Sequence, residues 1–555
     1  MKHFASIILF SFILLSNSLL AQMQGVYTVS GAGADFPSLQ QALNALESQG
    51  IDGPVTLNIR AGIYSTNFAI PPVSGSSEEN QIIIQSEDMD SSSVRFNYTA
   101  SSFADDFIFK FNGCSWVTIK HVTLQPLGPG GFSTYTRAVE FANGSHNNSL
   151  EFIHFLGRPF VNALTVYSAQ GNYCENIHIR NCHFKYGGTA VSIRNDGGIS
   201  MPNAPGLEVS NCYFEDQNYY AISAINNDQF LISNNLVVNP EDGNNITAMY
   251  FGNVDKGGEV SGNQIYIKGT HGIEFSYCFN DPGYRTRVFN NMVSLRAGTY
   301  GYGITISAPG NTSASNRSIL LAYNSVNVST GGEQQALNIF RIDSVNIVNN
   351  IFAVSGAYPA VYFQGGINEA NSFTNNCLYA PEGFLARNQL TATDYSDFES
   401  LISDMNFGQS CLNEEPQFYA IDDLHSGSTA LLNAGIPVEG ITSDIDQELR
   451  NSTNPSVGAD EIDSSPLTIN NINSKKDVEL QIFPQPAGSR INLRLEGNEG
   501  RCEWQLYDML GNQKMNGAFN GPDCQISTEL IGAGIYLLKF KSELLTRIEK
   551  IIIKK

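Results

Sequence analysis

A row of polar and aromatic residues recurs along the chain at intervals of about 28 residues. Each of them lies between two apolar residues of a short segment, as Glu274 does in Gly272-Ile273-Glu274-Phe275. Carboxylate, hydroxyl, amide and tyrosine side chains are groups that bind sugar hydroxyls and stack against sugar rings. The residues that we expect to bind substrate, from this row and the position two residues after it, are Glu140, Ser192, Arg194, Tyr250, Glu274, Asn338 and Tyr362. The pattern predicts a binding surface for an extended polysaccharide.

Two groups of charged residues are candidates for acid–base chemistry. Glu274 with His271 and either Arg285 or Arg287 would combine a base with a cation that neutralises substrate charge, as cleavage by a lyase requires. Asp196 and Asp228 each follow an asparagine just beyond the same segment in successive repeats, and glycoside hydrolysis requires a pair of acids. Either group could equally consist of solvated surface residues. The sequence leaves open whether the protein is a lyase or hydrolase, or a non-catalytic adhesin that only binds.

Two motifs with the same period must position these side chains. The first is a small residue, an aliphatic residue, any residue and an apolar one, and in Ala163-Leu164-Thr165-Val166 it assigns Thr165 to the row. The second motif is an apolar residue, a polar one, usually an asparagine, and another apolar residue. It predicts that the asparagines of successive coils stack and hydrogen-bond along the fold. The asparagines concerned are Asn181, Asn211, Asn235, Asn263, Asn291, Asn324, Asn350 and Asn376. We expect Cys182 and Cys212 to stack inside the coil beside them.

The repeat predicts an all-β fold. Each unit contains short alternating segments bounded by Gly, Asn and Ser, and no helix-length segment separates the units. A unit of about 28 residues is too short for a propeller blade and fits one coil of a parallel β-helix. We therefore expect a right-handed parallel β-helix of about ten coils.

The beginning of the chain resembles that of the pectate-lyase-like superfamily of right-handed parallel β-helix proteins. The similarity rests on Gly31-Ala32-Gly33-Ala34-Asp35-Phe36, on Leu39-Gln40-Gln41-Ala42-Leu43 and on the segment 55–64. It implies a helix at about 38–48 that caps the open end of the coil. It also implies polysaccharide binding along the strand face. The esterase motifs of that superfamily are absent from the sequence.

The β-helix domain is expected to span residues 22–462. The pattern of 394–405 predicts an amphipathic helix after the last coil, and 423–460 reads as a closing segment. We interpret His425 as structural, and Asp444 and Asp446 lack the full set of oxygen ligands of a calcium loop. No motif indicates a metal or another cofactor, and calcium is left open without a motif to support it.

The N-terminus and the overall composition predict export. Residues 1–21 have the basic start, apolar core and small final residue of a signal peptide. The 555 residues include only 15% charged ones, with a formal net charge of -22. Such an acidic chain excludes nucleic acid as a partner, and no later segment has the length of a membrane span. We expect a monomer that is secreted or held at the outer-membrane surface.

The C-terminus predicts how export occurs. Residues 463–477 have the composition of a linker, and 478–555 alternate short strands with glycine turns, as in a small β-sandwich. The order of Leu480–Pro486, Leu506–Gly511 and Gly532–Lys539 resembles the type A C-terminal sorting domain of the type IX secretion system. The resemblance implies that 478–555 binds the type IX machinery and has no catalytic role.

Overall fold

The computed structural model describes two compact units of the chain. It describes residues 22–462, apart from 129–136, 160–163, 169–170, 196–201, 240–245, 297–299, 308–315, 330 and 366–370, and residues 480–553, apart from 484–486, 496–499, 509–512, 522, 529–530, 533 and 543–545. The first unit is Met1–Asp463 and the second is Ser464–Lys555. The expected signal peptide and linker lie outside the described residues.

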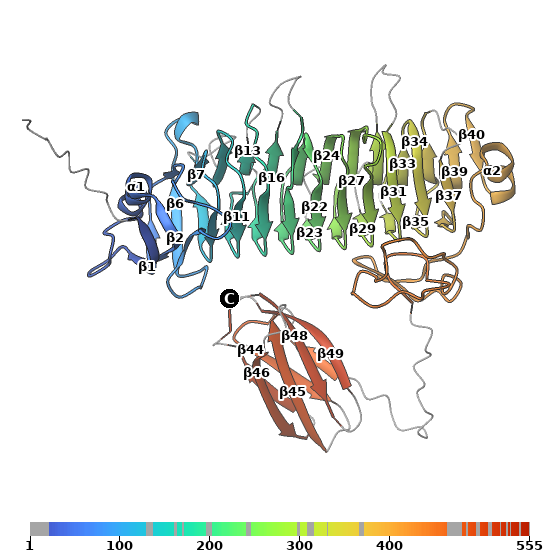
Figure 1. The fold of residues 1–555 in the computed structure, drawn as a ribbon. Helices are drawn as coiled ribbons and strands as arrows, with labels where there is room; N and C mark the ends of the chain where they lie inside the picture. Colours follow the sequence, from blue (N-terminus) through green and yellow to red (C-terminus); the bar gives the residue numbers. More distant parts are fainter. Residues whose placement is uncertain are drawn as a thin grey trace, which may run out of the picture. The chain divides into compact units, whose positions relative to one another are not determined.

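The first unit is a parallel β-solenoid whose turns pass through three sheets in succession (Figure 1). Sheet A contains β1 (Met23–Val29), β2 (Ile51–Ile59), β5 (Ile82–Ser86), β8 (Val117–Lys120), β11 (Asn148–Glu151), β14 (Ile177–Arg180), β18 (Glu208–Ser210), β22 (Phe230–Ser233), β25 (Gly258–Ser261), β28 (Thr286–Phe289), β31 (Asn316–Ala322), β34 (Ile342–Val348) and β37 (Ser372–Thr374). Sheet B contains β3 (Gly62–Tyr64), β6 (Val94–Tyr98), β9 (Thr123–Pro126), β12 (His154–Leu156), β15 (His183–Lys185), β19 (Tyr213–Glu215), β23 (Leu236–Asn239), β26 (Gln264–Ile267), β29 (Met292–Arg296), β32 (Ser325–Ser329), β35 (Ile351–Val354) and β38 (Cys377–Tyr379). Sheet C contains β4 (Phe68–Ile70), β7 (Phe109–Asn112), β10 (Val139–Ala142), β13 (Leu164–Ser168), β16 (Thr189–Arg194), β20 (Tyr220–Ile225), β24 (Ile246–Val254), β27 (Gly269–Cys278), β30 (Tyr300–Ser307), β33 (Glu333–Ile339), β36 (Pro359–Phe363), β39 (Phe384–Asn388) and the antiparallel β40 (Thr393–Tyr395).

The all-β solenoid confirms the expected fold class, with about twelve turns among the described residues instead of the ten expected. The difference arises at the N-terminal end, where the turns before Val117 carry neither repeat motif. Their strands still alternate buried and exposed residues, as β2 and β5 do. Alternation of buried and exposed residues is therefore enough to form a coil that lacks the asparagine motif.

An asparagine ladder runs inside one corner of the solenoid. The backbone N–H of Asn263 donates to Oδ1 of Asn291 at 3.0 Å, and the amide group of Asn291 donates to Asn324 at 2.9 Å. The same pattern links all six members, which are Asn235, Asn263, Asn291, Asn324, Asn350 and Asn376. Each is buried, so the ladder satisfies backbone groups that water cannot reach.

The prediction for Asn181 and Asn211 was wrong by one residue. Both have φ of 54° and occupy the left-handed turn position before the ladder, where asparagine is tolerated. The ladder position itself is taken by Cys182 and Cys212, as their expected stacking requires. The N–H of Cys212 donates to Oδ1 of Asn235 at 3.0 Å. In each Asn-Cys pair the asparagine matches the motif, but the cysteine after it occupies the ladder position. The motif therefore predicted a register that is wrong by one residue.

Small residues mark the bend of each turn in sheet C. A Cβ atom on Gly272 would lie 2.3 Å from Cγ1 of Val293, and one on Gly303 would lie 2.2 Å from Cγ1 of Val326. The alanines at the equivalent positions, such as Ala248 and Ala336, are fully buried. Close packing of the bend against the core therefore explains the small residue of the first motif.

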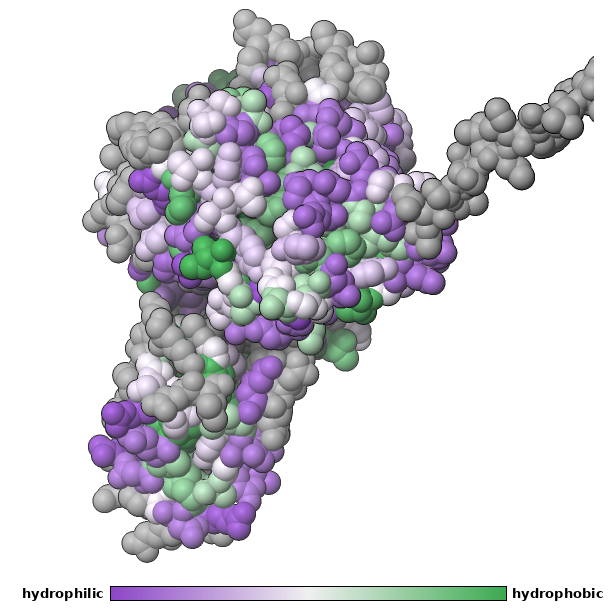
Figure 2. Space-filling model, turned by 90° about the vertical axis from the view of Figure 1, so that its left-hand side faces the viewer, coloured by the Kyte–Doolittle hydropathy of each residue, from purple (hydrophilic) through white to green (hydrophobic). Residues whose placement is uncertain are grey.

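Helices cover the two ends of the solenoid. Helix α1 (Leu39–Gln49) begins at Ser38, whose side chain accepts a hydrogen bond from the N–H of Gln41, and it buries four apolar residues against the core. The surface at this end is mainly hydrophilic, with scattered hydrophobic residues (Figure 2). Helix α2 (Phe398–Met405) packs Leu401 on the last coil. It begins four residues later than expected because 393–395 form strand β40.

The closing segment docks along the side of the solenoid. We call residues 412–462 the clasp; it includes the short hairpin β41 (Phe418–Ala420) and β42 (Asp423–Ser426). Asn290 and Asn349, at left-handed turn positions, donate through Nδ2 to carbonyl oxygens of the clasp at 2.7 and 2.6 Å. In Figure 1 the clasp lies beside the strands of the later turns. It therefore fastens several coils together as well as ending the domain.

The second unit consists of two small antiparallel sheets around its own core. One contains β43 (Leu480–Phe483), β44 (Arg490–Leu495) and β47 (Asp523–Ser527). The other contains β46 (Gln513–Asn520), β45 (Arg501–Asp508), β48 (Gly534–Lys541) and β49 (Thr546–Ile553). Leu493 of the first sheet and Leu538 of the second share one hydrophobic cluster, as expected for a sandwich. No helix in the described part of the chain has the length and apolar character needed to cross a membrane.

Candidate functional site

The strand register aligns one outward-facing residue from each turn of sheet C. We call this set the sheet C row: Lys110, Glu140, Tyr167, Ser192, Ser223, Tyr250, Glu274, Thr305, Asn338, Tyr362 and Arg387. The assignment of Thr165 to the row was wrong, because Val139 pairs with Val166 and Glu140 pairs with Tyr167. Thr165 is buried instead. The motif match in this turn had been placed two residues early.

A second outward row lies beside the first across the bend. It contains Thr189, Tyr220, Thr247, His271, Tyr302 and Gln335. Between His271 and Glu274 both intervening residues, Gly272 and Ile273, are buried, so the two polar side chains emerge on the same outer side. The rings of Tyr220 and Tyr250 are 5.9 Å apart between centroids. The two rows thus bring five tyrosines, a histidine and two glutamates to one surface.

Glu274 lies at the centre of this surface without a charged partner. It is partly buried, and no hydrogen bond or ion pair to its carboxylate is found among the described residues. Burial raises the pKa of Glu274, and the nearby carboxylate raises the pKa of Tyr220 beyond the effect of burial alone. A carboxyl group with a raised pKa and no structural partner is a typical feature of a functional site.

His271 is uncharged at neutral pH. Burial lowers its pKa to about 4. Its Nδ1 lies 3.1 Å from Oγ1 of Thr270, and its ring is 5.0 Å from the ring of Tyr302. The imidazole is therefore neutral, and of the predicted group His271 is the member on the same strand as Glu274, β27, and on the same outer side.

The structure does not bring the other catalytic candidates to Glu274. Arg285 is exposed and precedes β28 in sheet A, a different sheet from that of Glu274. Asp228 is buried in the short strand β21 (Asn227–Asp228), which pairs with β17 (Ala204–Pro205). Its Oδ1 accepts a hydrogen bond from the N–H of Asp255 at 2.8 Å, which is a structural contact in a turn. Asp196 lies outside the described residues.

The expected binding residues have unequal access along the row. Glu140 is 8% exposed and lies 3.1 Å from the ammonium group of Lys110. Oδ1 of Asn338 accepts a hydrogen bond from Gln364 at 2.9 Å. Ser192, Tyr250 and Tyr362 are partly exposed, and Arg194 is exposed at the end of β16.

Sequence reasoning missed Arg137, which packs beside the row. Its guanidinium is only 4% exposed and lies between the rings of Phe103 and Tyr167, 3.9 and 4.3 Å from their centroids. It also lies 3.6 Å from the buried carboxylate of Asp106, whose pKa burial raises to about 6. No repeat motif contains either residue, so the sequence carried no signal for this pair.

A second cluster of titratable groups lies in the clasp. His425, Asp446 and Asp460 each offer one ligand atom, and these atoms lie within 4.8 Å of one another, close enough to hold a cation. The imidazole, however, already makes hydrogen bonds to Asp446 at 2.7 Å and to Asp423. Asp446 and Asp423 together raise the pKa of His425 to about 9. A protonated His425 thus neutralises the carboxylates, in line with the structural role expected for it.

We expect the clasp to lose stability as the pH rises toward 9. The folded-state pKa of His425, about 9, is above the ordinary value of 6.5, so protonated His425 stabilises the fold fully below about 6.5. That contribution is lost as the pH rises through about 9. The melting temperature, measured between about pH 6 and pH 10, should fall by several degrees more in the wild type than in His425→Gln. Parallel pH profiles of the two proteins would contradict this role.

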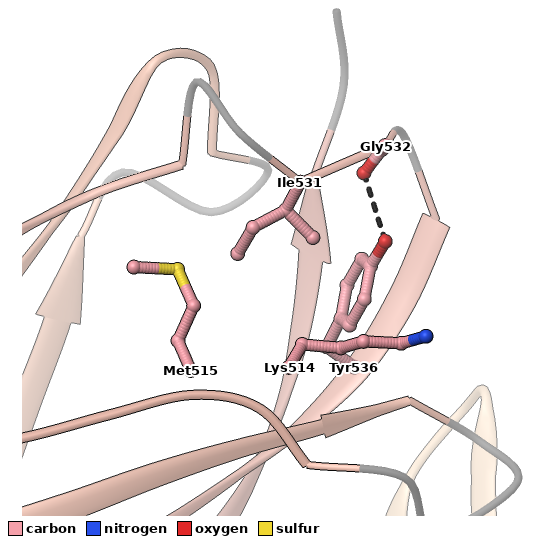
Figure 3. A pocket seen from close by; sticks show the side chains of 5 residues that line it. All are labelled: Lys514, Met515, Ile531, Gly532 and Tyr536. Carbon is pink, nitrogen blue, oxygen red and sulfur yellow. Dashed lines mark hydrogen bonds between the residues drawn. The ribbon is translucent and has the colours of Figure 1, made fainter.

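A small cavity in the second unit lacks the combination of groups that would make it an alternative candidate site. It has a volume of about 310 Å³ and is lined by Lys514, Met515, Ile531, Gly532 and Tyr536 (Figure 3). The hydroxyl of Tyr536 donates to the carbonyl oxygen of Gly532 at 3.0 Å. Of the described residues that line it, Lys514 and Tyr536 are ionisable and none is a carboxylate. The sheet C surface is therefore the better candidate site.

Comparison with known proteins identifies the second unit. Residues 481–554 match the family model of the secretion system C-terminal sorting domain. The domain addresses the chain to the type IX secretion machinery, so the protein is secreted or attached to the cell surface. No curated protein matches the chain.

Two solved structures are similar to the solenoid at low scores. The A-module of the mannuronan C-5 epimerase AlgE6 from Azotobacter vinelandii is 10% identical, covers 68% of this chain and 95% of its own, and has a TM-score of 0.30. ORF18 of Geobacillus virus E2 is 13% identical, covers 63% of this chain and 56% of its own, and has a TM-score of 0.16. Neither score assigns the solenoid to a superfamily.

Proposed function

We propose that the sheet C surface of this exported solenoid binds polysaccharide outside the cell. The observation that carries the proposal is the partnerless, partly buried carboxyl group of Glu274 beside Tyr220 and Tyr250. The carboxylate of Glu274 is open to solvent, so water satisfies it in the free protein and a ligand hydroxyl can replace that water. A sugar hydroxyl would supply the missing partner.

The shape of the surface suits a long ligand. Strands of neighbouring turns lie about 4.8 Å apart, so the eight steps from Glu140 to Tyr362 extend over about 40 Å. Tyrosines recur along this length and alternate with hydroxyl and amide side chains. Rings that stack on sugar faces and polar groups that bind sugar hydroxyls are the two contacts that a glycan chain needs.

Binding without cleavage is the reading that the described residues favour. Glu274 has neither a second carboxylate, as hydrolysis requires, nor a cation beside it, as a lyase requires, within the described part of the surface. The protein would then act as a surface adhesin. Cleavage is the second candidate, because the raised pKa of Glu274 suits a group that transfers a proton.

The test is a panel of polysaccharides assayed for binding and for new reducing or unsaturated ends. Tyr250→Ala should weaken binding about tenfold, the loss of about 1.4 kcal/mol expected for one stacking ring. Tyr213→Ala is the matched control, because Tyr213 faces outward from sheet B and stacks on His183. Equal binding by Tyr250→Ala and the wild type would contradict the proposal. New chain ends that disappear in Glu274→Gln would identify an enzyme.

A further inference from the structure

We infer that the sheet C row selects a neutral polysaccharide, one without carboxylate or sulfate groups. This inference rests on the binding function proposed above and concerns the charges that a ligand would meet. From Tyr167 to Tyr362 the row consists of eight residues, and none of them is a lysine or an arginine. The neighbouring row likewise contains no lysine or arginine.

The cations at the two ends of the row already have carboxylate partners. Lys110 lies 3.1 Å from Glu140, and Arg387 lies 3.3 Å from Asp394. Arg137 lies within 3.6 Å of Asp106 and 3.4 Å of Glu140. An anionic polymer would have to displace these contacts to find a counter-charge.

Among the described residues, none at the centre of the surface carries a positive charge. His271 is neutral because burial lowers its pKa to about 4, and Glu274 is either neutral or negative. A uronate residue placed here would meet the glutamate without a compensating cation. The formal net charge of -22 adds a long-range repulsion of the same sign.

The aromatic side chains supply the contacts that a neutral sugar uses. Tyr220 and Tyr250 form one pair of rings, and His271 and Tyr302 form another in the following turns, with centroids 5.9 and 5.0 Å apart. Tyr300, which is 36% exposed, extends this aromatic surface at the start of β30. Sugar C–H groups pack on such rings through apolar contact, which needs no charge on either side.

The experiment compares defined oligosaccharides on the full chain by calorimetry. Cellohexaose, mannohexaose and xylohexaose are the neutral probes, and hexagalacturonate and hexamannuronate are the anionic ones, each with and without calcium. We expect a neutral probe to bind at least about tenfold more tightly than either uronate. Its affinity should change less than about twofold between about 0.05 and 0.5 M salt, because screening acts on charge pairs only. Tyr250→Ala should weaken this binding about tenfold, and Tyr213→Ala should leave it unchanged.

The alternative outcomes separate the two proposals. Tighter binding of a uronate, with or without calcium, that is weakened by Tyr250→Ala would overturn the neutral selectivity and leave the binding surface in place. If no probe binds, or if Tyr250→Ala weakens the binding of none of them, the proposed function is overturned together with this inference.

Discussion

Replacing Asn291 by leucine is expected to lower the free energy of unfolding of the solenoid by about 4 kcal/mol. Oδ1 of Asn291 accepts from the backbone N–H of Asn263, and its amide group donates to the carbonyl oxygens of Val260 and Phe289 and to Asn324. Leucine fills a similar volume but removes the acceptor of the buried N–H of Asn263 and one donor each from the oxygens of Val260, Phe289 and Asn324. Urea unfolding followed by circular dichroism measures the effect.

The control is an asparagine at the same corner that occupies the turn position before the ladder and not the ladder itself. Asn234→Gly should change stability by less than about 1 kcal/mol, because Asn234 occupies the left-handed turn position that Gly262 occupies in the next turn. Asn291→Cys should cost less than Asn291→Leu, since Cys182 and Cys212 occupy the ladder position naturally. Equal stability of the Asn291→Leu and Asn234→Gly proteins would refute the ladder as a source of stability.

Arg450→Met is expected to release the clasp, at a cost of about 3 kcal/mol in its docking free energy. The guanidinium lies over the ring of Tyr323 at 3.9 Å, and Nη2 donates to Oδ1 of Asn290 at 2.9 Å. It also donates to the carbonyl oxygens of Gly458 and Ala459. Methionine keeps an unbranched apolar side chain that can pack on Tyr323 and removes all of these hydrogen bonds.

Hydrogen exchange of residues 412–462 measures this release. Exchange in the clasp should accelerate by about 100-fold, while exchange in the central turns stays unchanged. Arg387→Met is the matched control, because Arg387 pairs with Asp394 near the surface and does not contact the clasp. Acceleration through the whole solenoid would show that the clasp does not open as a separate element.

The sequence predicted the coils because their physics is local and repeats. Inward positions must be apolar, the bend has room only for a small residue, and the ladder needs an amide that both donates and accepts. Gly272, Gly303 and the ladder from Asn235 to Asn376 illustrate these three demands. The motifs alone did not always fix the register. At Thr165 the complete first motif occurs two residues before the row position, and at Asn181 the asparagine lies one residue before the ladder position.

The candidate site was only partly predictable for a related reason. Tyr250 and Glu274 share the row because the period of the repeat places them on neighbouring turns. The period does not place groups outside the strands: Arg285 was grouped with Glu274 by proximity in sequence, and Asp228 with Asp196 because each follows an asparagine just beyond the strand. In the fold Arg285 precedes a strand of another sheet, and Asp228 is buried in β21, where it accepts a hydrogen bond from the N–H of Asp255.

The sequence by itself determined the solenoid, the sorting domain and the row of outward residues, since each is encoded by contacts within one repeat or one short motif. Only the tertiary structure decided where the clasp lies and which polar groups lack a partner. Asn290 and Asn349 meet residues about 90 to 150 positions later in the chain, and no local pattern records such a contact. Glu274 shows the same dependence on the fold. That its carboxylate has no hydrogen-bond or ion-pair partner among the described residues can be seen only once its neighbours are placed around it.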